Sequence, residues 1–263
     1  MSDLREKMLA ECEREMAAEP IIGDFLKVAI IDQNTMSGSL AYVLVQRLKL
    51  MNLEVASQLT LFTSIFDLPD INVAFEADLL AVYDRDPACE SLLQCLLFYK
   101  GFHALQCHRL AHQLWLQKRK TLAFTIQSQS SLVFGVDMHP AAKVGSGVML
   151  DHATGLVVGE TCTIGNNVSI MQGVTLGGTG KTVGLRHPQI RDGVLISAGA
   201  IILGNVVIGE GAKVGAGSVV LDHVPAHTTA VGVPARLVGH PQTAQPALEM
   251  EHRLSPAADS DEK

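Results

Sequence analysis

A six-residue hydrophobic period runs through the second half of the chain. Twelve anchor positions hold only Ile, Leu or Val, and most anchors are followed three residues later by Gly or Asn. The anchors are Val144, Leu150, Val158, Ile164, Ile170, Leu176, Ile190, Ile196, Ile202, Ile208, Val214 and Val220. Gly and Asn tolerate the positive φ angles of tight turns. A fixed hexapeptide period therefore predicts a parallel β-helix, in which three hexads close one triangular coil and the anchors point inward.

The first half of the chain shows helical spacing instead. Two sets of apolar residues recur at intervals of three and four, which places each set on one helix face. These sets are Leu44, Leu48, Met51 and Val55, and then Cys107, Leu110, Ala111 and Leu114. The segments D-L-P-D at 67–70 and D-R-D-P at 84–87 predict turns, each before a new helix.

These patterns divide the chain into three parts and predict an α+β protein. We expect an α-helical domain over residues 1–136, a parallel β-helix over 137–240, and a tail over 241–263. The tail is rich in Pro, Ala, Gln and acidic residues. A segment of that composition buries little apolar surface, so a flexible tail is expected.

Two insertions interrupt the hexapeptide period. Eight residues instead of six separate Leu150 from Val158, across the sequence L-D-H-A-T-G-L-V, and fourteen separate Leu176 from Ile190. Each interval is two residues longer than a multiple of six, so the chain is expected to leave the regular coil there. Insertions in repeat proteins form loops on one face and often carry the function. The functional site is therefore expected at these interruptions.

Composition and charge narrow the function. Asp and Glu outnumber Lys and Arg by 27 to 20, and this acidic balance disfavours a nucleic-acid binder, which needs a basic surface. The uncharged stretch 193–209 approaches the length of a membrane span, but the hexapeptide period explains it, so no membrane segment is expected. Five cysteines without a C-x-x-C pair, and a charged N-terminus without an apolar run, favour the reducing cytoplasm over secretion.

Seven short motifs give the sequence a family resemblance. They are Y-D-R-D-P-A, K-G-F-H-A-L-Q, D-M-H-P-A-A-K, L-D-H-A-T-G, V-T-L-G-G-T-G-K, R-H-P-Q-I-R-D-G-V and G-V-P-A-R-L-V-G, between residues 83 and 240. The chain resembles bacterial serine O-acetyltransferase, a hexapeptide-repeat acyltransferase that acetylates L-serine from acetyl-CoA in cysteine biosynthesis. Hexads alone are shared with a wider acyltransferase group, whereas the L-D-H-A-T-G and R-H-P motifs with the acidic Y-D-R-D-P site are more specific. The resemblance implies a left-handed β-helix.

The resemblance also implies a catalytic pair. A serine hydroxyl is a poor nucleophile at neutral pH and needs a base, a role that suits histidine because its ordinary pKa is about 6.5. His152 lies in the first interruption and matches the family's base. Asp137 matches the carboxylate that orients the base, and it precedes His152 by fifteen residues, a little under one coil. The two are therefore expected on neighbouring coils of the triangular β-helix, which is called the prism below.

Further residues match the family's binding sites. Arg186 is expected to bind the serine carboxylate, Asp86 and Asp151 to hold the ammonium group, and His187 to add a hydrogen bond. Acetyl-CoA is the expected co-substrate, with no permanently bound cofactor and no metal. It is expected along the outside of the prism, where the positions that match the family are Gly178, Ala198, Lys213 and Ala216.

The resemblance extends to partners. It implies a homo-hexamer, a dimer of trimers with active sites between neighbouring prisms, and L-cysteine as a feedback inhibitor that shares the carboxylate and ammonium of serine. Many relatives bind O-acetylserine sulfhydrylase through a C-terminal isoleucine, but this chain ends in Lys263 after Asp261 and Glu262. Burying that charged end costs desolvation free energy, so this complex is expected to be weak or absent.

Other interpretations fit parts of the sequence. Another hexapeptide acyltransferase, acting on a sugar or an amine, would keep His152 but lack the combined acidic and basic amino-acid site. A β-helix enzyme of the γ-carbonic anhydrase type would need three converging histidines, and only His152 and His187 lie in the interruptions. A non-catalytic scaffold is a third alternative. Cys162 offers an acyl-enzyme mechanism, although it occupies a small apolar position of the repeat, where core packing is expected.

Overall fold

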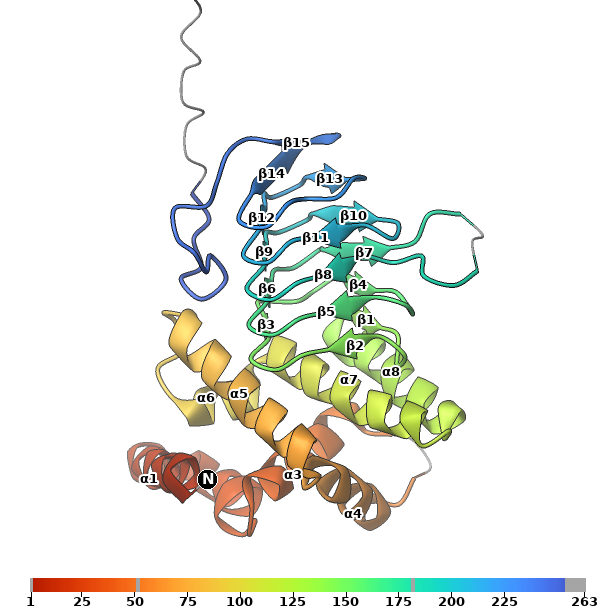
Figure 1. The fold of residues 1–263 in the computed structure, drawn as a ribbon. Helices are drawn as coiled ribbons and strands as arrows, with labels where there is room; N and C mark the ends of the chain where they lie inside the picture. The colour runs from red at the N-terminus through yellow and green to blue at the C-terminus, as the bar shows by residue number, and fades with distance from the viewer. Residues whose placement is uncertain (1, 51–52, 181–182, 254–263) are drawn as a thin grey trace, which may run out of the picture.

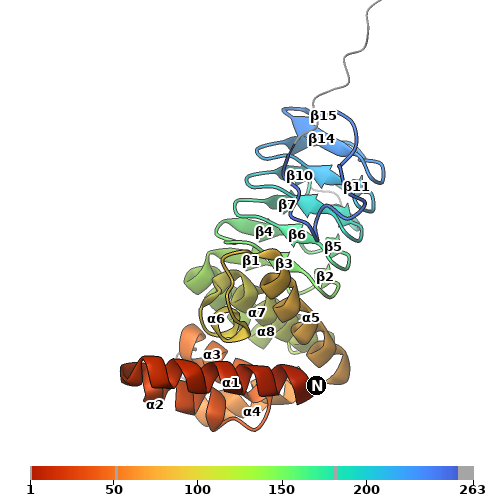
Figure 2. The same ribbon diagram turned by 90° about the vertical axis from the view of Figure 1, so that its left-hand side faces the viewer.

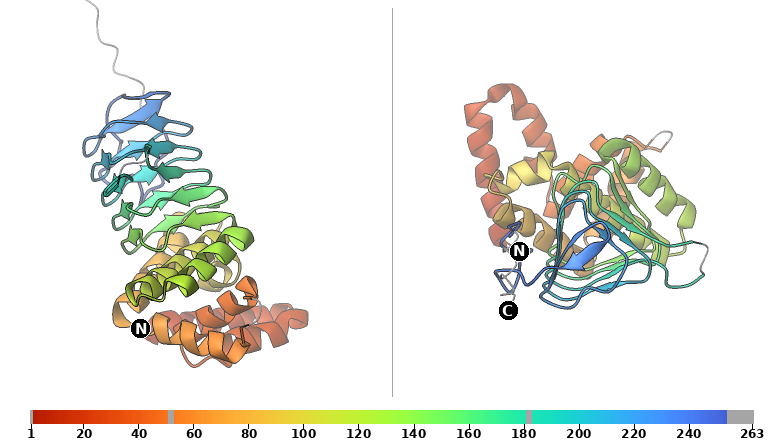
Figure 3. Two further views of the ribbon diagram at one scale, coloured as in Figure 1. Left: turned by 90° about the vertical axis from the view of Figure 1, so that its right-hand side faces the viewer. Right: turned by 90° about the horizontal axis from the view of Figure 1, so that it is seen from above.

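Helices occupy one end of the molecule and a three-sided prism of short strands occupies the other (Figure 1). The computed structural model describes residues 2–50, 53–180 and 183–253. Viewed along its length, the prism has a triangular outline from which one loop projects (Figure 3). The predicted order, a helical region followed by a parallel β-helix, is confirmed.

The described part of the helical region contains eight α-helices. They are α1 (Ser2–Ala18), α2 (Gly23–Leu26), α3 (Met36–Leu48), α4 (Val55–Phe66), α5 (Pro69–Arg85), α6 (Leu92–Phe98), α7 (Lys100–Leu116) and α8 (Lys120–Phe134). A 3-10 helix, η1 (Pro20–Ile22), and a π-helix, η2 (Lys27–Ile31), flank α2. Figure 2 shows α1, α2 and α4 farthest from the prism, with α5, α7 and α8 next to it. No described helix is both long and apolar enough to span a membrane.

Local sequence explains several helix ends. Pro69 stands in the first turn of α5, where its missing N–H is harmless, so the turn predicted at D-L-P-D is confirmed. At the start of α6 the Ser91 hydroxyl accepts a hydrogen bond from Gln94 N at 3.0 Å. Gly135 ends α8 in a left-handed conformation with φ 69° and turns the chain into the first strand.

One helix expected from the apolar spacing is wrong. Leu44 and Leu48 are buried on α3, but α3 ends there because Lys49 adopts a left-handed conformation with φ 46°. Val55 begins α4 and is 51% exposed, while Met51 lies outside the described residues. The spacing therefore spans two helices rather than one face of a single helix. The second predicted set, on α7, is buried as expected.

The prism is built from three sheets of short strands. The strands are β1 (Val136–Met138), β2 (Lys143–Val144), β3 (Met149–Leu150), β4 (Leu156–Val158), β5 (Thr163–Ile164), β6 (Ser169–Ile170), β7 (Thr175–Gly177), β8 (Gln189–Ile190), β9 (Leu195–Ile196), β10 (Ile201–Leu203), β11 (Val207–Ile208), β12 (Lys213–Val214), β13 (Val219–Val220), β14 (Thr229–Gly232) and β15 (Ala235–Leu237). Sheet A has the order β1-β4-β7-β10-β13, sheet B β2-β5-β8-β11, and sheet C β3-β6-β9-β12-β14-β15. All pairings are parallel except β14 with β15.

The hexad anchors fill the inside of the prism, as predicted. Eleven of the twelve are buried, and Val144 in the first coil is half-buried. Cys162 lies among them with 1% exposure, and burial raises the pKa of its thiol. Since the thiolate is the nucleophilic form, this environment favours core packing over an acyl-cysteine.

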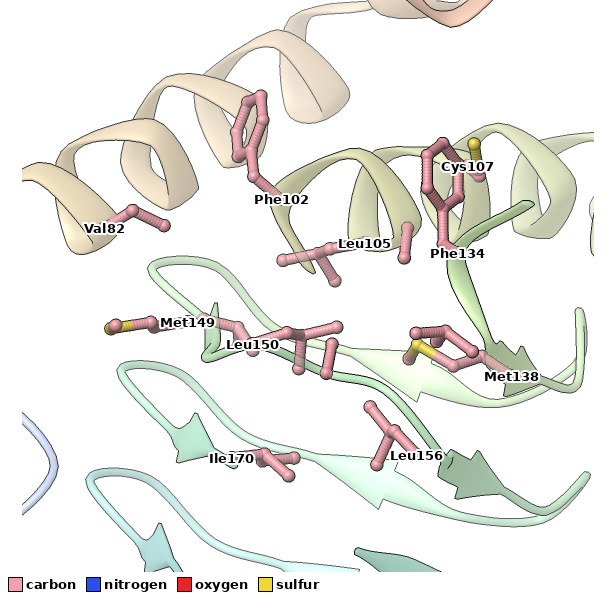
Figure 4. Close-up of a cluster of buried hydrophobic side chains, with 14 of the residues drawn as sticks. Val82, Phe102, Leu105, Cys107, Phe134, Met138, Met149, Leu150, Leu156 and Ile170 are labelled. Carbon is pink, nitrogen blue, oxygen red and sulfur yellow. The ribbon is translucent and has the colours of Figure 1, made fainter. Parts of the chain in front are cut away.

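A buried ion pair seats the helices on the first coil. Asp78 of α5 is fully buried and accepts a hydrogen bond from Arg109 Nε of α7 at 2.7 Å. Asp78 also accepts from Val148 N at 3.0 Å, and Arg109 Nη2 donates to Gly145 O at 2.6 Å. Apolar side chains of the helices face those of the first coils (Figure 4). The helical region is therefore fixed next to the first interruption of the repeat.

Part of the predicted tail packs along sheet C (Figure 1). Ala247 is fully buried, and its carbonyl accepts a hydrogen bond from Ser169 Oγ at 2.9 Å. Glu251 accepts one from Lys213 Nζ at 2.8 Å. Composition did not anticipate these contacts, because it does not reveal a buried lysine that needs a counter-charge. Residues 254–263, including Lys263, lie outside the described residues.

Candidate active site

The first interruption folds as a left-handed turn between β3 and β4. His152 and Ala153 have φ angles of 52° and 58°, and Gly155 follows with 80°. Within the turn, Ala153 N donates to Asp151 O at 2.5 Å and Thr154 N donates to His152 O at 2.8 Å. Two successive left-handed residues other than glycine are unfavourable and persist only where their surroundings hold them. The turn leaves the His152 side chain 74% exposed.

His152 lines a cavity of about 450 Å³ where the helices meet the prism. Asp86, at the end of α5, and Asp151 also line it, together with Tyr99 and Lys100 at the start of α7. His152 Nε2 lies 3.8 Å from Asp151 Oδ1. The structure thus brings three of the predicted residues, two carboxylates and one imidazole, into one cavity.

The electrostatics of this cavity favour a bound cation. Burial raises the pKa of Asp151, and the like charge of Asp86 raises it further, while His152 and His252 act in the opposite direction. Asp86 Oδ1 accepts a hydrogen bond from Ala88 N at 2.9 Å, which holds that carboxylate at the end of α5. Two carboxylates on one cavity repel each other, and an ammonium group between them relieves the repulsion.

The second interruption places Arg186 and His187 together at another edge of the prism. Arg186 Nη2 lies 2.5 Å from Glu160 Oε2, and this hydrogen bond lowers the pKa of Glu160. Thr161 N donates to His187 Nδ1 at 3.1 Å. A backbone N–H only donates, so Nδ1 accepts and the neutral imidazole carries its proton on Nε2. Burial lowers the pKa of His187, which favours this neutral, donating form.

The two interruptions lie at opposite ends of the strands of sheet A, and therefore at two different corners of the prism. His152 precedes β4, whereas Glu160, the partner of Arg186, follows it. Asp137 lies between these two corners, on β1, where it pairs with Val157 of β4. Its carboxylate accepts a hydrogen bond from Gln127 Nε2 at 2.5 Å, and none joins the two described residues Asp137 and His152 within one chain. Within one chain, the residues matched to the family's active site therefore fall into two separate groups.

The four positions matched to acetyl-CoA are likewise divided. Ala198 and Ala216 line one cavity of about 390 Å³, on the same corner of the prism as the first interruption. Gly178 lies at the other edge, where a Cβ atom built on it would be 3.3 Å from His187 Nε2. Lys213 lies on β12 and is only 1% exposed.

Sequence reasoning missed the part that the C-terminal segment plays here. Lys213 Nζ contacts Glu251 Oε2 at 2.8 Å and donates a second hydrogen bond to Arg253 O. His252 lines the cavity of Ala198, and its Nδ1 lies 3.4 Å from Ser197 Oγ. In this conformation the C-terminal segment covers Lys213, one of the four positions matched to acetyl-CoA.

Three further residues of the site were also missed. Tyr99 and Lys100 line the cavity of His152, and Glu160 holds Arg186. Lys100 belongs to the K-G-F-H-A-L-Q motif, which was a usable signal for a functional residue. Glu160 gave no such signal, because its role depends on the loop that folds back to bring Arg186 beside it.

Family models match two parts of the chain. Residues 4–107 match the serine acetyltransferase N-terminal model, and residues 187–222 match the bacterial transferase hexapeptide model of six repeats. Serine acetyltransferase 3, mitochondrial, of Arabidopsis thaliana is 51% identical over 95% of this chain, which covers 66% of that relative's length. Serine acetyltransferase of Escherichia coli K12 is 47% identical over 95% of this chain and 89% of its own length.

Solved structures with the same name share the fold. Soybean serine acetyltransferase complexed with serine is 53% identical, with a TM-score of 0.87 over 89% of this chain and 97% of its own. The Brucella abortus enzyme in complex with coenzyme A is 46% identical, with a TM-score of 0.87 over 90% and 96%. A serine acetyltransferase in complex with cysteine is 46% identical, with a TM-score of 0.93 over 96% and 99%. Sequence and fold agree over nearly the whole chain, which therefore belongs to the serine acetyltransferase family.

Proposed function

We propose that this chain transfers the acetyl group of acetyl-CoA to the hydroxyl of L-serine, giving O-acetylserine and CoA in cysteine biosynthesis. The soybean relative solved with serine and the Brucella relative solved with coenzyme A support these substrates. The observation that carries the proposal in this chain is the cavity in which His152 lies beside Asp86 and Asp151. An imidazole base and two anions suit a substrate that offers a hydroxyl and an ammonium group.

His152 acts as the general base in this mechanism. Its imidazole takes the hydroxyl proton while the serine oxygen attacks the thioester carbonyl carbon. The tetrahedral intermediate then breaks the carbon–sulfur bond, and the departing CoA thiolate takes the proton from the imidazolium. Asp86 and Asp151 hold the ammonium group throughout, and the negative charge of Asp151, 3.8 Å from Nε2, stabilises the imidazolium. The transfer is direct, without an acyl-cysteine.

A second copy of the chain completes the site. Arg186 and His187 lie across sheet A from His152, with Asp137 on the face between them. Prisms packed around a threefold axis would set the His152 edge of one copy against the Arg186 edge of the next. Arg186 then binds the serine carboxylate and Asp137 orients the base. Two such trimers, joined through their helical regions, form the proposed hexamer.

Acetyl-CoA is proposed to lie along the corner that continues from His152. The cavity lined by Ala198 and Ala216 supports this path, because backbone groups there can bind the amides of the pantetheine arm. Gly178 comes from the neighbouring copy, beside its His187. Lys213 meets a phosphate only after the segment that holds Glu251 moves away. The enzyme is proposed to need no resident cofactor and no metal.

Further proposals concern ligands, partners, cellular location and domain organisation. L-Cysteine competes with serine, as the relative solved with cysteine supports. Binding of O-acetylserine sulfhydrylase through residues 254–263 is proposed to be weak, because this segment carries Asp261, Glu262 and Lys263 where an apolar side chain is needed, and calorimetric titration of a peptide of these residues tests it. The protein works in the cytoplasm, with functional units at residues 1–136 and 137–240 and a tail from 241.

An assay of CoA release tests the proposed function. L-Serine is compared with sugars and other amines as the acetyl acceptor, and serine is expected to lead by at least about a hundredfold in kcat/KM. A preferred sugar or amine would favour the alternative hexapeptide acyltransferase, and no acceptor at all would favour a scaffold. A zinc hydrolase of the γ-carbonic anhydrase type is disfavoured because it needs three histidines on one zinc, and the two interruptions supply only His152 and His187.

A further inference from the structure

The first turn of α7 is pressed against the turn that carries His152. A Cβ atom built on Gly101 would lie 2.0 Å from Leu150 O and 3.4 Å from the Cβ atom of Ala153. A carbon–oxygen contact of 2.0 Å is far too short, and a backbone oxygen has no rotamer by which to move away. Only glycine therefore lets α7 approach this closely. Leu150 immediately precedes Asp151, and Ala153 immediately follows His152.

Two more contacts hold the same turn. Lys100 Nζ donates a hydrogen bond to Thr154 Oγ1, two residues after His152. From the other side, Gly155 N donates to Gly135 O, at the end of α8, at 2.7 Å. The turn is thus held between the beginning of α7 and the end of α8.

This support matters because the turn is strained and the base makes few contacts of its own. His152 and Ala153 adopt left-handed φ angles of 52° and 58°, which relax unless neighbouring groups hold them. The His152 side chain is 74% exposed, and its Nε2 lies 3.8 Å from Asp151 Oδ1. Ala153, by contrast, is fully buried beneath Gly101. The backbone therefore sets where the imidazole lies.

We propose that Gly101 and Lys100 are positioning residues, which hold His152 and Asp151 in the geometry that the reaction needs. Gly101 acts by allowing α7 to approach the turn closely. Lys100 acts by holding the C-terminal side of the turn through its hydrogen bond to Thr154. The proposal rests on the proposed role of His152 as the base. A misplacement of a catalytic group by one ångström lowers the rate by about a hundredfold, so a modest shift of the turn has a measurable effect.

Steady-state kinetics of matched variants test this proposal. Gly101→Ala is expected to lower kcat by about a hundredfold while the KM for acetyl-CoA stays within about twofold. Lys100→Met and Thr154→Val are each expected to lower kcat by about tenfold, and Lys100→Arg, which keeps a donor, recovers most of it. Gly23→Ala is the control for the added methyl, because its Cβ atom would meet only Met16 at 4.0 Å. Lys143→Met, on the exposed side of β2, is the control for the lost charge.

The thermal midpoint of Gly101→Ala shows whether this variant folds. A second test, which does not depend on Gly101→Ala, combines the changes at Lys100 and Thr154. If Lys100 acts through Thr154, Lys100→Met with Thr154→Val is no slower than either single variant. Losses that multiply in the double variant, or a folded Gly101→Ala with wild-type kcat, would overturn the proposal. His152→Ala in the same assay separates the two hypotheses. If it is active, the proposed base is wrong; if it is inactive while the Gly101 and Lys100 variants are active, only the positioning role is wrong.

Discussion

Lys213 Nζ lies 2.8 Å from Glu251 Oε2, and the two side chains are only 2% and 10% exposed. One partner belongs to β12 of the prism and the other to the C-terminal segment, so this ion pair fixes the segment along sheet C. Removing one partner of a buried pair leaves an uncompensated charge. The pair therefore occupies the ammonium group of Lys213, which is proposed to meet a phosphate of acetyl-CoA.

Breaking this pair is expected to change the affinity for acetyl-CoA. Glu251→Gln should lower the KM for acetyl-CoA several-fold, because the segment then competes less well for Lys213. Lys213→Met should raise it by about tenfold through loss of a charge-assisted hydrogen bond. Both constants are measured with acetyl-CoA varied at saturating serine, and Glu249→Gln, at an exposed site nearby, is the control. An unchanged KM in both variants would remove Lys213 from the acetyl-CoA site.

Because the pKa of Asp151 is raised, the affinity for serine is expected to fall at acidic pH. As the pH falls through this raised pKa, Asp151 gains a proton and loses the charge that is proposed to hold the ammonium group. The KM for serine should therefore begin to rise at a higher pH than an ordinary carboxyl would produce. In Asp151→Asn the KM for serine should be at least about tenfold higher near neutral pH, and it should rise less at acidic pH than in the parent protein. A pH profile of kcat/KM for serine that is identical in both proteins would contradict the assignment.

The same group lowers the stability of the folded chain near neutral pH. Its pKa is higher in the folded state than in the unfolded state, so between the two values the folded state binds more protons. Stability therefore falls as the pH rises through that window. Above the window, Asp151→Asn should have a higher thermal midpoint than the parent, and below it the difference should vanish. A midpoint for Asp151→Asn that is lower at every pH would show that the charge is fully compensated.

Cysteine and serine are expected to compete for one site. Both carry the carboxylate and the ammonium group that Arg186, Asp86 and Asp151 are proposed to bind. Asp86→Ala should weaken both ligands together, each by about tenfold, because one anion of the pair is lost. Inhibition constants for cysteine are measured at several serine concentrations. Cysteine inhibition that survives in Asp86→Ala and is not relieved by serine would require a separate regulatory site.

Two side chains distinguish direct transfer from an acyl-enzyme. His152→Ala should lose about a hundredfold or more of kcat while keeping its fold, because only the base is removed. Cys162→Ala should keep its activity and lose roughly 1 kcal/mol of stability through the small cavity that it creates. Circular dichroism confirms the fold of each variant beside the CoA-release assay. Full activity in His152→Ala, or a folded but inactive Cys162→Ala, would reverse the assignment.

The sequence predicted the prism well because its packing repeats locally. Ile196 must fill the interior in the same way as Ile170 and Val214, its partners in the neighbouring coils, so each anchor repeats the constraint of the last. The helix expected over 44–55 failed because Lys49 ends α3 in a left-handed conformation, and lysine gives no local signal for that. A glycine in that position would have marked the helix end.

The site was predicted unevenly for a related reason. Motifs identified Asp86, Asp151 and His152, which the structure gathers in one cavity although helix and prism contribute them separately. Arg186 lies away from this cavity because the two interruptions occupy different corners of the prism. The corner that each interruption occupies depends on the number of strands that precede it in the coil, and not on its residue types. The cover over Lys213 depends on a contact between segments 38 residues apart, which no local pattern encodes.

Pairs of inactive variants test most directly whether serine acetylation takes place between two copies. His152→Ala and Arg186→Ala are each expected to lose most activity alone. Co-expressed and purified as mixed assemblies, they should regain roughly a quarter of wild-type activity, since random mixing in a ring leaves that share of sites with His152 from one copy and Arg186 from the next. Co-expression of His152→Ala with Asp151→Ala is the control, because both changes lie in the same half of the site. Recovery in the first mixture alone is the predicted result, and a first mixture no more active than its two components would contradict a shared site.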